Sequence, residues 1–156
     1  MPSHSALFLS EKNKLERFCA YEDRCVFQIR KKLLTSLLPE AEKEMLITTL
    51  INDWFLDDFR FACSYVSGKS RIKKWGAHKI YRGLKSYQIK PDQISLAMKE
   101  IALDDYMNTL KELIERKKVL LSDTQDPYKK KVKIIRYLTG KGYSLTDIYR
   151  SGIEED

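Results

Sequence analysis

The spacing of apolar residues constrains this chain more than any other feature of its sequence. Apolar side chains recur every three or four residues, for example at Val26, Ile29, Leu33 and Leu37. This spacing places them on one side of an α-helix. The alternation of apolar and polar residues that marks a half-buried strand does not occur over a useful length. The pattern therefore predicts an all-α protein.

Two local signals suggest where the early helices begin. Asp23 precedes the second apolar run and can accept a hydrogen bond from a free helix amide, so we expect it to be an N-cap. Pro39 suits the first turn of a helix, where its missing N–H has no helical partner. We expect that helix to carry Leu46, Leu50 and Trp54 on its apolar side.

The same elements return along the chain. The letters LDDF at Leu56–Phe59 return 47 residues later as LDDY at Leu103–Tyr106. A second series returns after 54 residues, in which Ile80, Leu84, Ile89 and Ile94 are followed by Ile134, Leu138, Tyr143 and Ile148. The difference of seven residues predicts a longer connection near Leu120–Asp126. We therefore expect three tandem units of three helices each, at residues 8–55, 56–102 and 103–153.

A unit of about 50 residues buries little apolar surface on its own. Stacked neighbours would cover each other's apolar faces, so we expect three tandem three-helix repeats in an elongated helical array and not one globe. The composition favours an ordered chain, because 43% of its 156 residues are apolar and it contains only six glycines and four prolines.

The cysteines and the N-terminus indicate a cellular compartment. Cys19, Cys25 and Cys63 are odd in number and lack C-x-x-C spacing, which is typical of free thiols in a reducing compartment. The apolar run Ala6–Leu9 is too short for a signal peptide or a membrane span. We expect a cytoplasmic, monomeric protein that does not bind a membrane.

The stretch GKSRIKKWG at Gly68–Gly76 begins like the end of a nucleotide-binding loop. That loop needs a further glycine five residues earlier, where this chain has Cys63, and a strand before it. Residues 59–62 look helical instead. The sequence therefore predicts no nucleotide role here, and we expect a basic connection between two helices.

Other candidate sites have simpler explanations. Asp57 and Asp58 could form a metal or acid–base pair, but adjacent helical residues point about 100° apart. The Leu-Asp-Asp that recurs before the first helix of two units instead predicts an N-cap in each, with acidic charge at the positive end of the helix. His4 and His78 have no partner at ligand spacing. No nucleophile, base and orienting group converge on one stretch, so we expect no enzyme, no bound metal and no cofactor.

The charge distribution is the main functional signal. The net charge of +7 favours a partner with negative charge, such as nucleic acid, an acidic protein or a membrane surface. Residues 59–91 contain nine basic and no acidic side chains, and residues 127–146 contain six and none. A solvated helix face normally mixes signs, because opposite charges at i, i+4 add stability. Single-sign faces favour binding over an ordinary wet surface.

The basic residues oppose apolar ones on the predicted helices. In the helix near Gly76, Lys79 and Arg82 lie opposite Ile80 and Leu84. The helix near Tyr128 has an equivalent basic face. The candidate binding residues are Lys69, Arg71, Lys73, Lys74, Trp75, Lys79, Arg82, Lys129, Lys133 and Arg136. The ring of Trp75 could fix the turn at Gly76, or it could stack on a base or a partner's side chain.

Three segments resemble the RecX family of bacterial recombination regulators: LDDFRFACSYV at 56–66, KKWGAHKIYRGL at 73–84 and KIIRYLTGKGYSLTDI at 133–148. The resemblance is weaker in the first unit, where Asp23–Arg24 stand where the family often has a serine cap. It implies three tandem three-helix repeats, in agreement with the repeats above. It also implies a non-enzymatic protein that binds RecA filaments on single-stranded DNA and damps ATP hydrolysis and strand exchange in recombination and repair.

Two functional classes remain open from the sequence. The first is a regulator that binds the RecA filament. The second is a stand-alone helical nucleic-acid-binding module that acts directly on single-stranded DNA. Steep salt dependence with a bare oligonucleotide would favour the second class, whereas binding that requires a preformed filament would favour the first.

Overall fold

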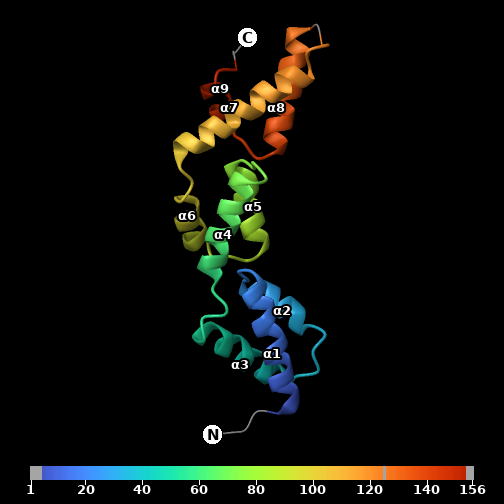
Figure 1. The fold of residues 1–156 in the computed structure, drawn as a ribbon, viewed down its shortest axis with the longest axis vertical. Coiled ribbons are helices and arrows are strands. Elements are labelled where there is room, and N and C mark those ends of the chain that lie inside the picture. Colours follow the sequence, from blue (N-terminus) through green and yellow to red (C-terminus); the bar gives the residue numbers. More distant parts are fainter. Residues whose placement is uncertain (1–4, 125, 154–156) are drawn as a thin grey trace.

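The computed structural model describes residues 5–124 and 126–153. Within these ranges the regular elements are all α-helices, and they follow one another along a single long axis from the N-terminal to the C-terminal end (Figure 1). The helices are α1 (Ala6–Tyr21), α2 (Val26–Leu33), α3 (Glu40–Asn52), α4 (Asp58–Arg71), α5 (Ala77–Ser86), α6 (Pro91–Met98), α7 (Leu103–Leu120), α8 (Pro127–Gly140) and α9 (Leu145–Arg150). The expected all-α array of three-helix repeats is confirmed.

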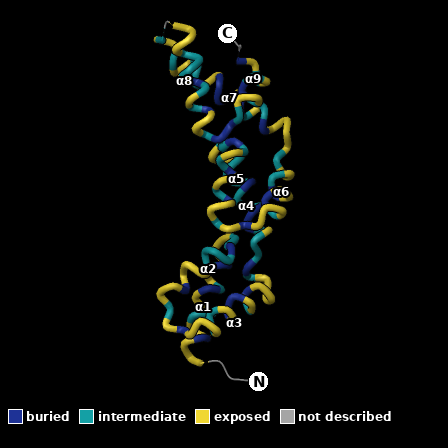
Figure 2. The backbone as a smooth tube through the Cα atoms, turned by 180° about the vertical axis from the view of Figure 1, so that it is seen from behind, coloured by how far each residue is buried: buried dark blue, intermediate teal, exposed yellow. Residues whose placement is uncertain are grey.

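Each group of three helices encloses its own hydrophobic core. The first core lies among α1–α3, the second mainly among α4–α6 and the third among α7–α9. Buried residues follow the inside of each group along the tube in Figure 2. In both views α2, α5 and α8 lie along one side of the long axis, and α3, α6 and α9 lie along the other.

The series that recurs after 54 residues marks equivalent core positions. All eight of its members are at most 4% exposed, including Leu84 and Leu138 at 0%. These side chains are the buried anchors of the second and third helices in two repeats. Helical periodicity therefore located these anchors correctly, whereas Leu37, which continues the spacing of the first repeat, lies beyond the end of α2 and is 88% exposed.

The LDD motif, by contrast, does not mark equivalent positions. Leu56 is buried, whereas Leu103 is 67% exposed. Asp57 caps α4, accepting a hydrogen bond from the amide of Arg60 at 2.9 Å, whereas α7 begins at Leu103 with Ala102 before it. Asp104 and Asp105 lie inside the first turn of α7 and cap nothing, so the predicted second cap is wrong.

The buried residues of α4 and α7, the first helices of the second and third repeats, correspond at an offset of 48 residues and not 47. Ala62 and Val66 on α4 correspond to Leu110 and Ile114 on α7, and all four are buried. The 47-residue offset of the motif is therefore wrong by one residue. The repeated LDD letters are identical in sequence, but structural equivalence between the two helices is set by the side chains that they bury.

Two predictions about the first repeat are also wrong. The N-cap of α2 is Cys25 and not Asp23, whose carboxylate instead binds α4. Trp54 lies beyond the end of α3 at Asn52 and is 75% exposed, so it is not part of that helix's apolar side. Pro39 precedes the first helical residue of α3 as its N-cap.

The first junction, between α1–α3 and α4–α6, depends on side chains. The Asp58 carboxylate accepts a hydrogen bond from the Val26 amide at 2.8 Å. Asp23 accepts hydrogen bonds from the Arg60 guanidinium, at 2.8 Å, and from the Ser64 hydroxyl. Cys25 is fully buried in the second core, which extends across this junction.

The second junction, between α4–α6 and α7–α9, brings two backbones into contact. The Gly76 amide donates to the Lys141 carbonyl at 2.7 Å, and the His78 amide donates to the Gly142 carbonyl at 3.0 Å. A Cβ atom at Gly76 would overlap the backbone of Gly142. Glycine is therefore required for this close approach.

Candidate partner-binding surface

Trp75 lies between two of the candidate lysines. The Nζ atoms of Lys69, on α4, and Lys79, on α5, are 4.8 and 4.4 Å from the centre of its ring. The ring also packs against the second core and meets Tyr65 edge to face. Cations over an aromatic face are attracted by the ring. Trp75 therefore fixes the chain near the second junction and holds two positive charges in place.

Lys74 belongs to the second junction as much as to the surface. Its backbone has a φ of 57°, and its carbonyl accepts a hydrogen bond from the Tyr143 hydroxyl at 2.8 Å. Its Nζ atom lies 3.4 Å from the Glu112 carboxylate. Part of its charge is therefore neutralised within the protein.

Two lysines near this junction were not among the sequence candidates. Lys117 and Lys141 both lie over the ring of Tyr137, at 4.4 and 5.7 Å from its centre. Burial, and then the nearby charge of Lys74, lower the pKa of Lys141. The basic run at 127–146 already contained Lys141, but nothing in the sequence indicated the contact of Lys117, which comes from another helix.

Five candidates are free for a partner. They are exposed and have no side-chain hydrogen bond or ion pair with any described residue: Lys73, Arg82, Lys129, Lys133 and Arg136. On α8, Lys129, Lys133 and Arg136 lie within about 60° of one another around the helix axis. Four of these five residues belong to α5 and α8, and these two helices lie along one side of the array (Figure 1).

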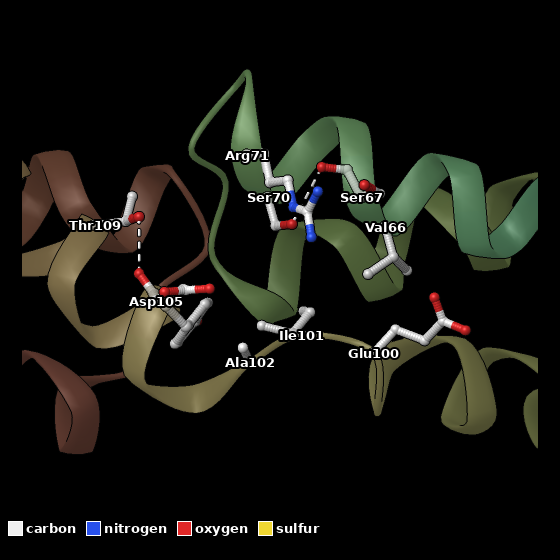
Figure 3. A pocket seen from close by; sticks show the side chains of 10 residues that line it. Val66, Ser67, Ser70, Arg71, Glu100, Ile101, Ala102, Asp105 and Thr109 are labelled. Atoms are coloured by element: carbon white, nitrogen blue, oxygen red, sulfur yellow. Dashed lines mark hydrogen bonds between the residues drawn. The ribbon is translucent and has the colours of Figure 1, made fainter.

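Arg71 is separated from the other candidates. It lies two residues after Lys69 on α4, which turns its side chain about 200° away. It lines a cleft between α4 and the start of α7, together with Ser70, Glu100 and Asp105 (Figure 3). The two carboxylates make this cleft a poor continuation of a surface that binds anions.

The Gly-Lys-Ser triplet is part of a helix. Gly68–Arg71 form the last turn of α4, so only Ile72–Gly76 connect α4 to α5, and the prediction that the whole stretch is a connection is wrong. The Ser70 hydroxyl donates to the Ser67 carbonyl at 3.3 Å. A helical backbone uses its amides internally and cannot cradle a phosphate.

Both acidic residues of the pair Asp57–Asp58 have structural roles. Asp57 caps α4, and Asp58 binds the amide at the start of α2. Within residues 5–124 and 126–153, no group of three His, Cys, Asp or Glu could hold a metal ion. His78 is exposed, and His4 lies outside the described residues.

No helix in the described ranges combines the length and the apolar character that crossing a bilayer requires.

Comparison with known proteins identifies the family. The family model of the second three-helix domain of RecX matches residues 57–98, and that of the third matches residues 104–150. Together the two models account for more than half of the chain. The chain belongs to the RecX family. The matches fall on the second and third repeats, where the sequence resemblance was also stronger.

Relatives named regulatory protein RecX match most of this chain. That of Leuconostoc mesenteroides is 30% identical over 134 residues, covering 82% of this chain and 48% of the relative. That of Clostridium tetani is 30% identical over 122 residues, covering 78% and 56%. That of Yersinia pseudotuberculosis is 29% identical over 120 residues, covering 74% and 63%. The chain thus spans between about half and under two thirds of the length of these relatives.

Solved RecX structures have the same fold. The crystal structure of a regulatory protein RecX superposes with a TM-score of 0.84 at 22% identity, covering 95% of this chain and 74% of the other. RecX from Lactobacillus salivarius gives a TM-score of 0.83 at 21% identity, covering 93% and 94%. The helical array is therefore the RecX fold, in a family whose named members are regulatory proteins.

Proposed function

We propose that this protein binds the RecA nucleoprotein filament and inhibits the recombinase and ATPase activities of RecA in DNA recombination and repair. Membership of the RecX family supports a regulatory role. The observation that carries the proposal is the group of exposed, unpaired basic residues on α5 and α8, two helices that lie along one side of the elongated array. A filament that contains DNA presents negative charge over a long distance, which this side would complement.

Inhibition by this route needs no catalytic group. A protein that binds one state of a filament better than another shifts the equilibrium between them by the difference in affinity. The three repeats could contact successive parts of a groove, because their second helices share one side of the array. The effect should therefore depend on the ratio of the protein to RecA, as expected for binding without turnover.

The test is a strand-exchange and ATPase assay of RecA with this protein titrated in. The informative variant reverses four exposed charges that have no partner among the described residues: Lys73→Glu, Arg82→Glu, Lys133→Glu and Arg136→Glu. Lys74 is kept because it pairs with Glu112 across the second junction, and Lys79 because it lies over the ring of Trp75. Exposed charges contribute little to folding, so helicity and melting should hardly change.

A matched control reverses four exposed basic residues that lie outside α2, α5 and α8: Lys14, Arg17, Lys99 and Lys111. Both variants change the net charge equally, so a general charge effect would weaken the inhibition of RecA by both variants. We expect only the first to lose inhibition. If the first variant folds and inhibits RecA at wild-type concentrations, the binding surface lies elsewhere.

A second measurement separates filament binding from direct DNA binding. For a protein that binds single-stranded DNA through phosphate contacts, affinity falls steeply with salt, with a slope of about −0.7 per contact. We expect weak binding to a bare oligonucleotide and tight binding to the preformed filament. Equal affinity for both would favour a stand-alone DNA-binding module.

A further inference from the structure

Trp54 occupies a backbone position that normally belongs to glycine. After α3, the Trp54 amide donates to the Ile51 carbonyl at 3.1 Å, and the Phe55 amide donates to the Leu50 carbonyl at 3.0 Å. These two bonds define a Schellman motif, in which the residue after the C-cap has a left-handed backbone. Trp54 has a φ of 64°, and a bulky side chain is strained in this conformation. After α8 the same position is held by Gly142.

The indole of Trp54 contributes little to the fold. It is 75% exposed, whereas the other tryptophan, Trp75, packs against the second core. Ile51, one turn earlier on α3, is also 44% exposed. Neither the backbone nor the first core accounts for a tryptophan here.

The backbone that presents the indole is held firmly. The Nη2 atom of Arg60 donates to the carbonyls of Trp54 and Phe55, at 3.1 and 3.2 Å. The same guanidinium binds Asp23 across the first junction, and Phe55 packs against the first core. Rigid, exposed aromatic side chains lose little freedom on binding, and tryptophan is enriched among the residues that dominate protein interfaces.

The charges around Trp54 favour a protein over a nucleic acid. The exposed Asp53 precedes it at the C-terminal end of α3, the negative end of the helix dipole. Residues 8–55 contain eight basic and eight acidic side chains, a net charge of zero. Residues 56–102 contain ten basic and four acidic side chains, a net charge of +6. Phosphates would therefore be attracted more strongly to the second repeat than to the surface around Trp54.

We propose that Trp54 anchors a protein–protein contact, in which its indole fills an apolar pocket with a neutral or positively charged rim on a protein subunit of the filament. This inference rests on the proposed function and divides the binding surface in two. The first repeat contacts protein through Trp54, while α5 and α8 face the DNA-bearing groove.

The test replaces Trp54 by glycine, which suits the left-handed backbone. Trp54→Gly should melt at the same temperature as the wild type or higher. Its binding to RecA filaments, assembled on immobilised single-stranded DNA with a non-hydrolysable ATP analogue and measured by biolayer interferometry, should be at least about tenfold weaker. The control is Leu103→Ala, which removes another exposed apolar side chain and should bind like the wild type.

A parallel binding measurement with bare oligothymidine distinguishes a protein contact of the indole from stacking on a base. Binding by Trp54→Gly that is weakened on filaments but unchanged on the oligonucleotide supports the inference. Equal loss on both would place the indole on a base and overturn it. Trp54→Gly that binds filaments like the wild type overturns the inference alone, whereas a wild-type protein that does not bind filaments overturns the proposed function and the inference with it.

Discussion

The two junctions between repeats use the same capping device in different surroundings. At the first junction, Asp58 in the first turn of α4 accepts the amide of Val26, the first residue of α2. At the second, Tyr106 in the first turn of α7 accepts the amide of Ala77, the first residue of α5, at 2.9 Å. The second and third repeats thus each supply the acceptor that caps the second helix of the repeat before it.

The remaining contacts differ between the junctions. The first junction adds the ion pair of Asp23 with Arg60, whose side chains are 31% and 40% exposed. The second also has a partly exposed ion pair, between Lys74 and Glu112, but adds backbone hydrogen bonds between Gly76 and Lys141 and between His78 and Gly142. Exposed ion pairs are weak and sensitive to salt, whereas close backbone contacts leave no room for adjustment. The second junction should therefore be the stiffer of the two.

The largest expected effect is at Gly142. Its φ is 103°, and a Cβ atom there would overlap Lys79, so Gly142→Ala combines backbone strain with a clash. We expect a loss of about 3 kcal/mol in the free energy of unfolding, measured with urea. Gly68→Ala is the control, because a Cβ atom there meets nothing within 4 Å. That substitution, inside α4, should stabilise the protein by up to about 1 kcal/mol. Similar unfolding midpoints for the two variants would contradict a tight second junction.

The two equivalent caps allow the next comparison. Tyr106→Phe and Asp58→Ala each remove the acceptor of one helix-starting amide, Ala77 and Val26 respectively. Both amides are only partly buried, and the loss of a capping acceptor typically costs about 1 kcal/mol, so both variants should lose stability by about that amount. Hydrogen exchange should show faster opening of α5 in the first variant and of α2 in the second. Opening of the same helix in both would rule out two separate capping contacts.

The first junction also predicts a dependence on pH. Burial raises the pKa of Asp58 above 3.8, although the hydrogen bond from Val26 opposes the shift. The folded state then holds the proton of Asp58 more tightly than the unfolded state does. Stability from this group is therefore full below the unfolded pKa and is lost as the pH rises through the folded pKa.

Asp58→Asn tests this dependence while keeping an oxygen acceptor for Val26. From about pH 4 to about pH 7, the stability of the wild type minus that of the variant should fall. Urea unfolding at each pH gives the difference directly. A difference that rises with pH would show that the carboxylate is stabilised, and not penalised, at the junction.

The smallest expected effect is at Asp23. Its ion pair with Arg60 is partly exposed, so Asp23→Ala should cost less than about 1 kcal/mol. The cost should shrink further at high salt, where exposed charges are screened. Asp53→Ala, which removes an exposed carboxylate without an ion-pair partner in the described ranges, serves as the reference. A large loss that does not respond to salt would mean that the first junction is as rigid as the second.

The sequence predicted the cores well and the junctions poorly, for a physical reason. Helical periodicity indicates which side chains are buried, so the sequence alone places Leu84 and Leu138 in the cores. The contact of Asp23 with Arg60 spans 37 residues and leaves no periodic signal. Asp23 looked like a cap because its local sequence allows one.

The candidate binding surface was likewise predicted in part: the sequence indicated where the charge lies but not which side chains contact each other. Runs without acidic residues identified the exposed face of Lys129, Lys133 and Arg136, because charge is visible in the letters. The letters did not reveal that Arg71 turns away from Lys69 or that Glu112 partly neutralises Lys74. Trp54 was misplaced in a helix because its left-handed backbone departs from what its side chain favours.

The local construction of the three cores has a consequence for how the chain acquires its structure. Each core is built mainly from residues close together in sequence, so the loops that must close during folding are short. Short loops cost little entropy, and proteins rich in local contacts fold quickly. Synthesis releases only about 5–20 residues per second. The first three helices can therefore pack while the last three are still being made, and Asp58 then docks onto a repeat that is already in place.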